Sequence, residues 1–117
     1  MADLTLYVKP TCTTCRKSVE LLRREKVDFE TIDFFKSRLT AAALKGLCRK
    51  LGVSPREILR TKDPAYEALG LASGRHTDAE LLELMVSHPG LIQRPIAVKG
   101  GRAVVGRPPE SIVELLR

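Results

Sequence analysis

A pair of cysteines, Cys12 and Cys15, lies between an apolar segment and a helix-like run, and it constrains this chain more than any other feature. Residues 3–8 alternate apolar and polar side chains and predict a buried strand, whereas residues 13–26 carry apolar side chains at helical spacing. The first backbone N–H groups of a helix have no partner inside it, which favours a thiolate over a thiol at that position. Cys12 is therefore a candidate nucleophile.

Cys15 follows Cys12 by one helical turn, so the two sulfurs are expected to lie near each other. The spacing leaves two interpretations open: Cys15 is a resolving thiol that closes a disulfide, or it is a small residue that faces the core. Zinc would need four ligands, and the other candidates stand singly along the chain: Cys48, His76 and His88. We therefore predict no metal, and we expect Cys48 to be a packed apolar residue.

The order of strand and helix signals predicts an α/β fold. Residues 29–34 alternate again after the first helix, which gives a βαβ unit with two parallel strands. From residue 39 to residue 89 only helix signatures occur. Residues that can cap a helix precede three of these runs: Thr40, Ser54 and Thr77.

The last part of the chain returns to strand signals. Residues 95–99 and 102–106 flank a Gly-Gly turn and predict a hairpin, and an amphipathic helix is expected from about residue 108 to 116. This order around a C-x-x-C pair predicts a thioredoxin-like mixed sheet with an inserted helical subdomain. We expect one domain spanning 1–117, with the core formed by 1–36 and 92–117 and the helical insertion by 37–91.

Composition narrows the class of protein. With 44% hydrophobic and 29% charged residues, the 117 residues are typical of one globular domain with its own core. No signal peptide and no membrane span is predicted, and three cysteines with a single C-x-x-C favour a reducing compartment such as the cytoplasm. The formal charge is +6, but the basic residues are scattered among acidic ones and aromatic residues are few, which argues against nucleic-acid binding.

Three arginines are candidate anion ligands, because guanidinium groups offer planar forks of donors that match the oxygens of an oxyanion. Arg94 precedes Pro95, a proline that belongs at a strand start or in a cis bond. Arg107 lies where the last strand passes into the last helix, and Arg60 lies in the helical region.

These residues together resemble the glutaredoxin-coupled arsenate reductases, the ArsC family, which includes the Spx-like redox regulators. The matching stretches follow the order of the family over most of the chain: 7–16, 58–60, 66–71, 88–96 and 105–108. The resemblance implies that Cys12 attacks arsenate and that Arg60, Arg94 and Arg107 bind its oxygens. It also implies that glutathione and glutaredoxin, or thioredoxin, supply the electrons, with no cofactor bound to the protein itself.

The chain departs from the arsenate reductases at two positions. Val8 stands where those enzymes usually carry a histidine that lowers the pKa of the cysteine, so we expect charge from Lys9, Arg16 and Lys17 instead. Cys15 replaces a serine, as in the Spx-like group, and it could displace the first adduct faster than an external thiol. The alternative function is therefore a thiol-redox-sensing transcriptional regulator that binds RNA polymerase.

Overall fold

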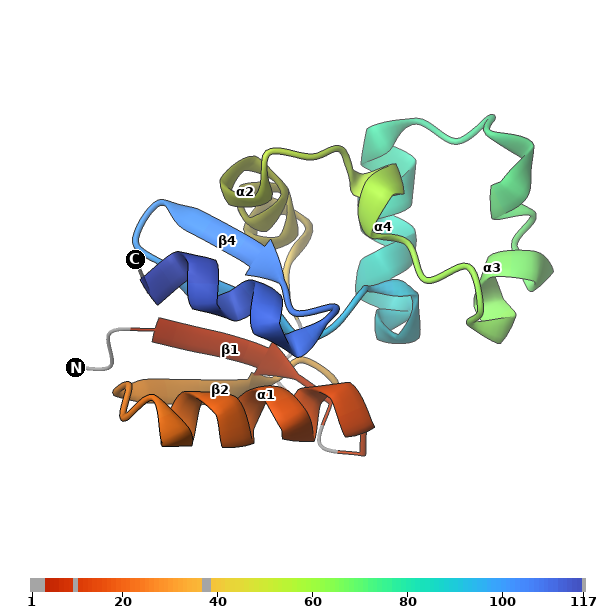
Figure 1. Ribbon diagram of the computed structural model, residues 1–117. Coiled ribbons are helices and arrows are strands. Elements are labelled where there is room, and N and C mark those ends of the chain that lie inside the picture. Colours follow the sequence, from red (N-terminus) through yellow and green to blue (C-terminus); the bar gives the residue numbers. More distant parts are fainter. Residues whose placement is uncertain (1–3, 10, 37–38, 117) are drawn as a thin grey trace. The chain divides into compact units, whose positions relative to one another are not determined.

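The computed structural model describes residues 4–9, 11–36 and 39–116. The chain forms two compact units, one composed of Met1–Ser37 with Arg94–Arg117 and the other of Arg38–Gln93. The second unit is thus inserted between the two halves of the first (Figure 1). No helix among the described residues has the length and apolar character needed to cross a membrane.

A four-stranded mixed sheet forms the centre of the first unit, in the order β2-β1-β3-β4 (Figure 1). Its strands are β1 (Leu4–Val8), β2 (Phe29–Asp33), β3 (Ile96–Lys99) and β4 (Arg102–Val105). β1 pairs parallel with β2 and antiparallel with β3, and β3 pairs antiparallel with β4. The predicted βαβ unit, hairpin and thioredoxin-like mixed sheet are therefore confirmed.

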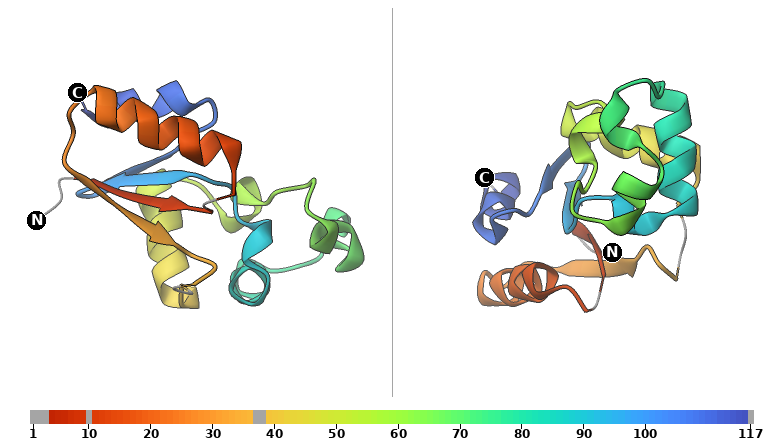
Figure 2. Two further views of the ribbon diagram at one scale, coloured as in Figure 1. Left: turned by 90° about the horizontal axis from the view of Figure 1, so that it is seen from below. Right: turned by 90° about the vertical axis from the view of Figure 1, so that its right-hand side faces the viewer.

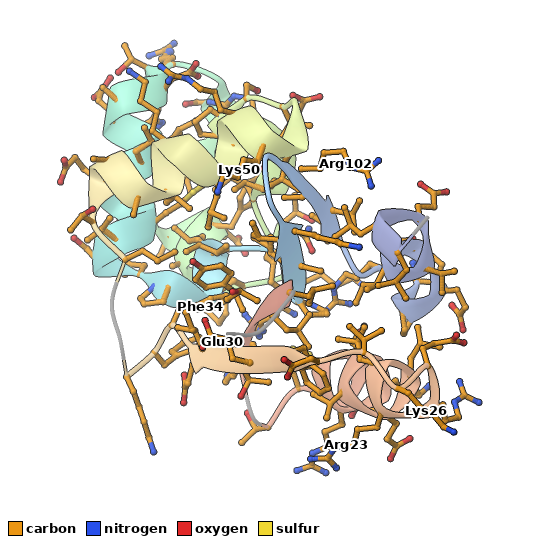
Figure 3. The ribbon with its side chains drawn as sticks, turned by 90° about the vertical axis from the view of Figure 1, so that its left-hand side faces the viewer. Arg23, Lys26, Glu30, Phe34, Lys50 and Arg102 are labelled. Atoms are coloured by element: carbon orange, nitrogen blue, oxygen red, sulfur yellow. The ribbon has the colours of Figure 1, made fainter. Side chains whose placement is uncertain are left out.

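Two helices cover one face of this sheet, α1 (Thr13–Arg24) and the 3₁₀ helix η4 (Pro109–Leu116), and they lie side by side in Figure 2. Both contribute buried side chains to the core that β1 and β3 also line; the core includes Leu4, Leu6, Val8, Cys15, Leu22, Ala97, Ile112 and Leu115. α1 ends two residues before the predicted boundary, because Lys26, which is labelled at the end of this helix in Figure 3, adopts a left-handed φ of 56°. At the other end of α1, Cys12 lies at the junction with β1 and packs, partly buried, against this core.

The final helix differs in type from the α-helix expected there. Residues Pro109–Leu116 form a 3₁₀ helix, in which side chains three positions apart lie in line. Its two buried side chains, Ile112 and Leu115, have that spacing, so a three-residue turn directs both into the core. The amphipathic pattern predicted the buried face, but it did not separate the two helix types.

Residues 39–93 of the second unit form helices and one isolated bridge between Leu59 and Ile92, with no further strand. Its elements are α2 (Ala41–Leu51), η1 (Pro55–Ile58), α3 (Pro64–Ala68), η2 (Leu71–Ser73), α4 (Asp78–Ser87) and η3 (Pro89–Leu91). The expected caps are present: the Thr40 hydroxyl accepts from the Ala43 N–H at 3.0 Å, and Thr77 and Glu80 exchange hydrogen bonds at 2.9 and 3.2 Å. Ser54 begins the 3₁₀ helix η1, and its N–H donates to the Glu57 carboxylate at 2.7 Å.

Candidate active site

Cys12 is the N-cap residue of α1. Its backbone is extended, with φ −81° and ψ 123°, and its carbonyl accepts the first hydrogen bond of the helix from the Arg16 N–H at 3.1 Å. The Cys12 N–H donates to the Lys9 carbonyl at 2.9 Å, which closes the turn between β1 and α1. The thiol is partly exposed and no side-chain cap occupies the end of the helix, so the free N–H groups of the first turn face the sulfur.

The surroundings of the Cys12 sulfur favour its ionised form. Partial burial opposes ionisation, because a thiolate loses hydration there. Hydrogen bonds from the backbone N–H and thiol of Cys15 and from the Thr14 N–H outweigh this penalty, and the charge of Arg107 adds to them. Together they hold the pKa of Cys12 below its ordinary value, so its thiolate is more populated at neutral pH than that of a free cysteine.

Arg107 reaches the thiol from a position 95 residues along the chain, in the segment between β4 and η4. Its Nη2 lies 3.8 Å from the Cys12 Sγ, and its Nε donates to the Arg94 carbonyl at 2.7 Å. The peptide bonds Arg94–Pro95 and Arg107–Pro108 are both cis. An exposed guanidinium is therefore fixed by its Nε while its other end faces the sulfur.

Cys15 lies in the first turn of α1, is only 2% exposed, and forms part of the hydrophobic core. Burial raises the pKa of Cys15 to about 11, since the nearby Cys12 adds to the effect while the Lys9 N–H and the charge of Arg94 only reduce it. Cys15 is consequently a thiol at neutral pH, and it donates a hydrogen bond to the Cys12 sulfur. The two sulfurs lie close together and Cys15 faces the core, whereas its role as a resolving thiol stays a prediction.

The ring of Phe35, which the sequence analysis did not single out, contacts two cations near the cysteine pair, Lys9 and Arg94. The Lys9 Nζ lies 4.9 Å from the centroid of the ring, and the guanidinium carbon of Arg94 lies 5.7 Å from it. Lys9 is thus held over an aromatic face, and the charge of Arg107 contributes to the lowered pKa of Cys12. The sequence did offer one signal for this contact. Two phenylalanines follow β2, and because Phe34 fills the buried position, the ring of Phe35 is left to contact other side chains.

The second unit holds the remaining candidates. The Arg60 N–H donates to the Leu91 carbonyl at 2.7 Å, beside the Leu59–Ile92 bridge, and its side chain is half-buried. The approach of Arg60 to Cys12 stays a prediction. Cys48 is buried in α2, and its pKa is raised by burial and by the charge of Asp78.

The two histidines of this unit lie at the two ends of α4. His76 lies next to the N-cap residue Thr77 and is half-buried, whereas the exposed His88 caps the other end and has its Nδ1 3.2 Å from the Leu84 carbonyl oxygen. Over residues 4–9, 11–36 and 39–116, no group of three His, Cys, Asp or Glu side chains could hold a metal ion.

Comparison with known proteins places these features in a family. The family model described as the ArsC family matches residues 7–115. The uncharacterized protein YfgD of Escherichia coli (strain K12) is 36% identical to this chain over 97% of both, and the arsenate reductase of that strain is 35% identical over 99% of this chain and 82% of its own length. The solved structure of the arsenate reductase from Vibrio cholerae superposes with a TM-score of 0.92 at 32% identity and covers 97% of each chain. The chain therefore belongs to the ArsC family.

Proposed function

We propose that this protein reduces arsenate to arsenite, with the Cys12 thiolate as nucleophile. The observation that carries the proposal is the Arg107 guanidinium 3.8 Å from a sulfur whose pKa is lowered. Relatives named as arsenate reductases, 32–35% identical over nearly the whole chain, support the same activity. A positive group beside a thiolate matches an anionic oxyanion substrate.

In the first step the Cys12 thiolate attacks arsenic(V). A sulfur–arsenic bond forms, and one arsenate oxygen takes up protons and leaves as water. Both reactants are anions, so the attack requires cations that offset their repulsion, and we assign this role to Arg107, Arg94 and Arg60. Fixed donors act most strongly on the charge that builds up on the arsenate oxygens, because they need no reorganisation during the reaction.

In the second step another thiol supplies the electrons. This thiolate attacks the Cys12 sulfur, a disulfide forms, the sulfur–arsenic bond breaks, and its electron pair stays on arsenic, which leaves as arsenic(III). The position of Cys15 supports an internal disulfide, since proximity favours the neighbouring sulfur even though its raised pKa keeps it protonated. Glutathione with glutaredoxin, or thioredoxin, then returns the protein to its dithiol form.

An assay of arsenite formation with defined thiol donors tests the proposal. We expect turnover with glutathione and glutaredoxin, and in the oxidised protein peptide mass mapping should identify a bond between Cys12 and Cys15. Absence of arsenite with every thiol donor would exclude the proposed activity, and finding only glutathione on Cys12 would exclude the internal disulfide. Since the reaction consumes reduced thiols, we propose that it takes place in the cytoplasm.

The comparisons lend no support to the alternative, a redox-sensing regulator that binds RNA polymerase. The relatives described above that carry a functional name are reductases. The arginines also fit an enzyme better, because a sensor of thiol oxidation has no need of a guanidinium held beside the reactive sulfur.

A further inference from the structure

Among the glycines described in the first unit, Gly106 is the one with no room for a side chain. A Cβ added to this residue would lie 2.9 Å from the Pro95 Cγ, 3.0 Å from the Ile112 Cδ1 and 3.2 Å from the Ser18 Oγ. Carbon atoms in ordinary contact are about 3.5 to 4 Å apart, so no larger residue fits without movement. The requirement is for space, because no left-handed φ is recorded at Gly106.

The three neighbours of Gly106 come from the elements that build the active site. Ser18 is completely buried in α1, where its hydroxyl donates to the Thr14 carbonyl at 3.0 Å, and this helix begins at Cys12. Pro95 precedes β3, and its carbonyl accepts from the Gly106 N–H at 2.8 Å. The contact therefore joins the helix that carries the thiol to the segment that carries the guanidinium.

Arg107 is the next residue, and its position is sensitive to this contact. Its Nε is held at 2.7 Å by the Arg94 carbonyl, and its Nη2 is 3.8 Å from the Cys12 sulfur, so a shift of the segment by a few tenths of an ångström would disturb both distances. A Cβ added at position 106 would meet Ser18 of α1 and Ile112 of η4. A side chain at position 106 would therefore push the segment outward.

We infer that Gly106 is a positioning residue for Arg107: its lack of a side chain lets the segment after β4 lie against Ser18 of α1, and this contact sets the reach of the guanidinium to the Cys12 sulfur. The inference rests on the proposed role of Arg107 in binding the oxyanion. It makes the spacing of the active site depend on a contact that touches neither the substrate nor the sulfur.

A double-mutant cycle tests this without arsenate. The probe is the ratio of the alkylation rates of Cys12 by iodoacetate, an anion, and by neutral iodoacetamide, because a nearby cation raises that ratio. We expect Arg107→Ala to lower the ratio by about threefold to tenfold and Gly106→Ala to lower it nearly as much. The double variant should show no further loss, since Gly106 acts through Arg107.

Gly101→Ala is the matched control, since it lies in the turn of the same hairpin with no atom within 4 Å of the added Cβ. We expect its ratio to equal that of the unchanged protein. An unchanged ratio in folded Gly106→Ala, or losses that add in the double variant, would overturn the inference.

If Gly106→Ala does not fold, two further variants decide. Ser18→Val enlarges the same contact from the helix side and should lower the ratio, whereas adding Ile112→Val to Gly106→Ala removes the Cδ1 contact and should restore folding and part of the ratio. A normal ratio in folded Ser18→Val contradicts the inference. Failure of arsenate turnover in the unchanged protein would defeat the proposed function alone, because the alkylation ratio does not depend on it.

Discussion

Cys12 and Cys48, one in each unit of the molecule, occupy opposite environments. Cys12 starts a helix, is partly exposed, and has N–H donors and Arg107 around its sulfur, so its pKa is lowered. Cys48 lies inside α2, is 4% exposed, and has the negative Asp78 nearby, so its pKa is raised. The pKa of the same side chain is thus lowered in one unit and raised in the other, because of its place in a helix and the sign of the nearest charge.

The largest contrast is expected when each cysteine is removed in turn. Cys12→Ser should lower arsenate reduction by more than about 1,000-fold, because a serine hydroxyl is a far weaker nucleophile than a thiolate. Cys48→Ser should retain the rate per folded molecule, since its sulfur takes no part in the chemistry. Steady-state arsenite formation measures both, and equal losses in the two variants would contradict the assignment of Cys12.

The guanidinium groups come next in expected effect. Arg107→Ala and Arg94→Ala should each lower kcat/KM for arsenate by about tenfold to a thousandfold, because fixed donors beside developing charge contribute that much in other enzymes. Arg24→Ala, an exposed basic residue at the far end of α1, is the control and should keep the rate. Melting temperatures distinguish the loss of a substrate contact from the loss of folding. Unchanged kinetics would mean that the substituted arginine does not bind arsenate.

A smaller effect is expected from the hydrogen bond between the two active-site sulfurs. Cys15→Ala removes the donor, so the pKa of Cys12 should rise and its alkylation by iodoacetamide at pH 7 should slow by roughly threefold to tenfold. In Cys15→Ser a hydroxyl can still donate, and the rate should stay close to that of the unchanged protein.

The pH dependence of cysteine alkylation follows from the pKa shifts of the three cysteines. A lowered pKa places the rise in alkylation of Cys12 at lower pH than for a free thiol, whereas Cys48 and Cys15 should react only at higher pH. Mass spectrometry of each cysteine across pH 5 to 10 gives the three profiles. Coincident profiles for Cys12 and Cys48 would remove the contrast between the two units.

The smallest effect concerns the second unit alone. Thr77→Ala removes the cap of α4 and should cost about 1 kcal/mol of unfolding free energy. Alkylation of Cys12 at pH 7 should stay unchanged, because the hydrogen bonds of the cap join residues of the second unit and the thiol belongs to the first. Thermal unfolding and the alkylation rate measure the two quantities, and a slower alkylation would mean that the second unit tunes the thiol.

Local sequence signals predicted most of the secondary structure. Alternation located the strands, and the caps at Thr40 and Thr77 marked helix starts, since each depends on residues only a few positions apart. Such signals could not predict that Lys9 lies over Phe35, because an aromatic face competes with the thiol for the same flexible ammonium. Nor could they set the distance from Arg107 to Cys12, which depends on the packing of the segment after β4 against α1.

The interrupted order of the first unit has a consequence for the newly made protein. β1 pairs on one side with β2, which is synthesised soon afterwards, and on the other with β3, which follows only after the whole second unit. Cys12 is therefore synthesised well before Arg107, whose guanidinium lies 95 residues further along the chain. The Arg107 charge that helps to lower the pKa of Cys12 is thus in place only after the second half of the first unit has folded onto its first half.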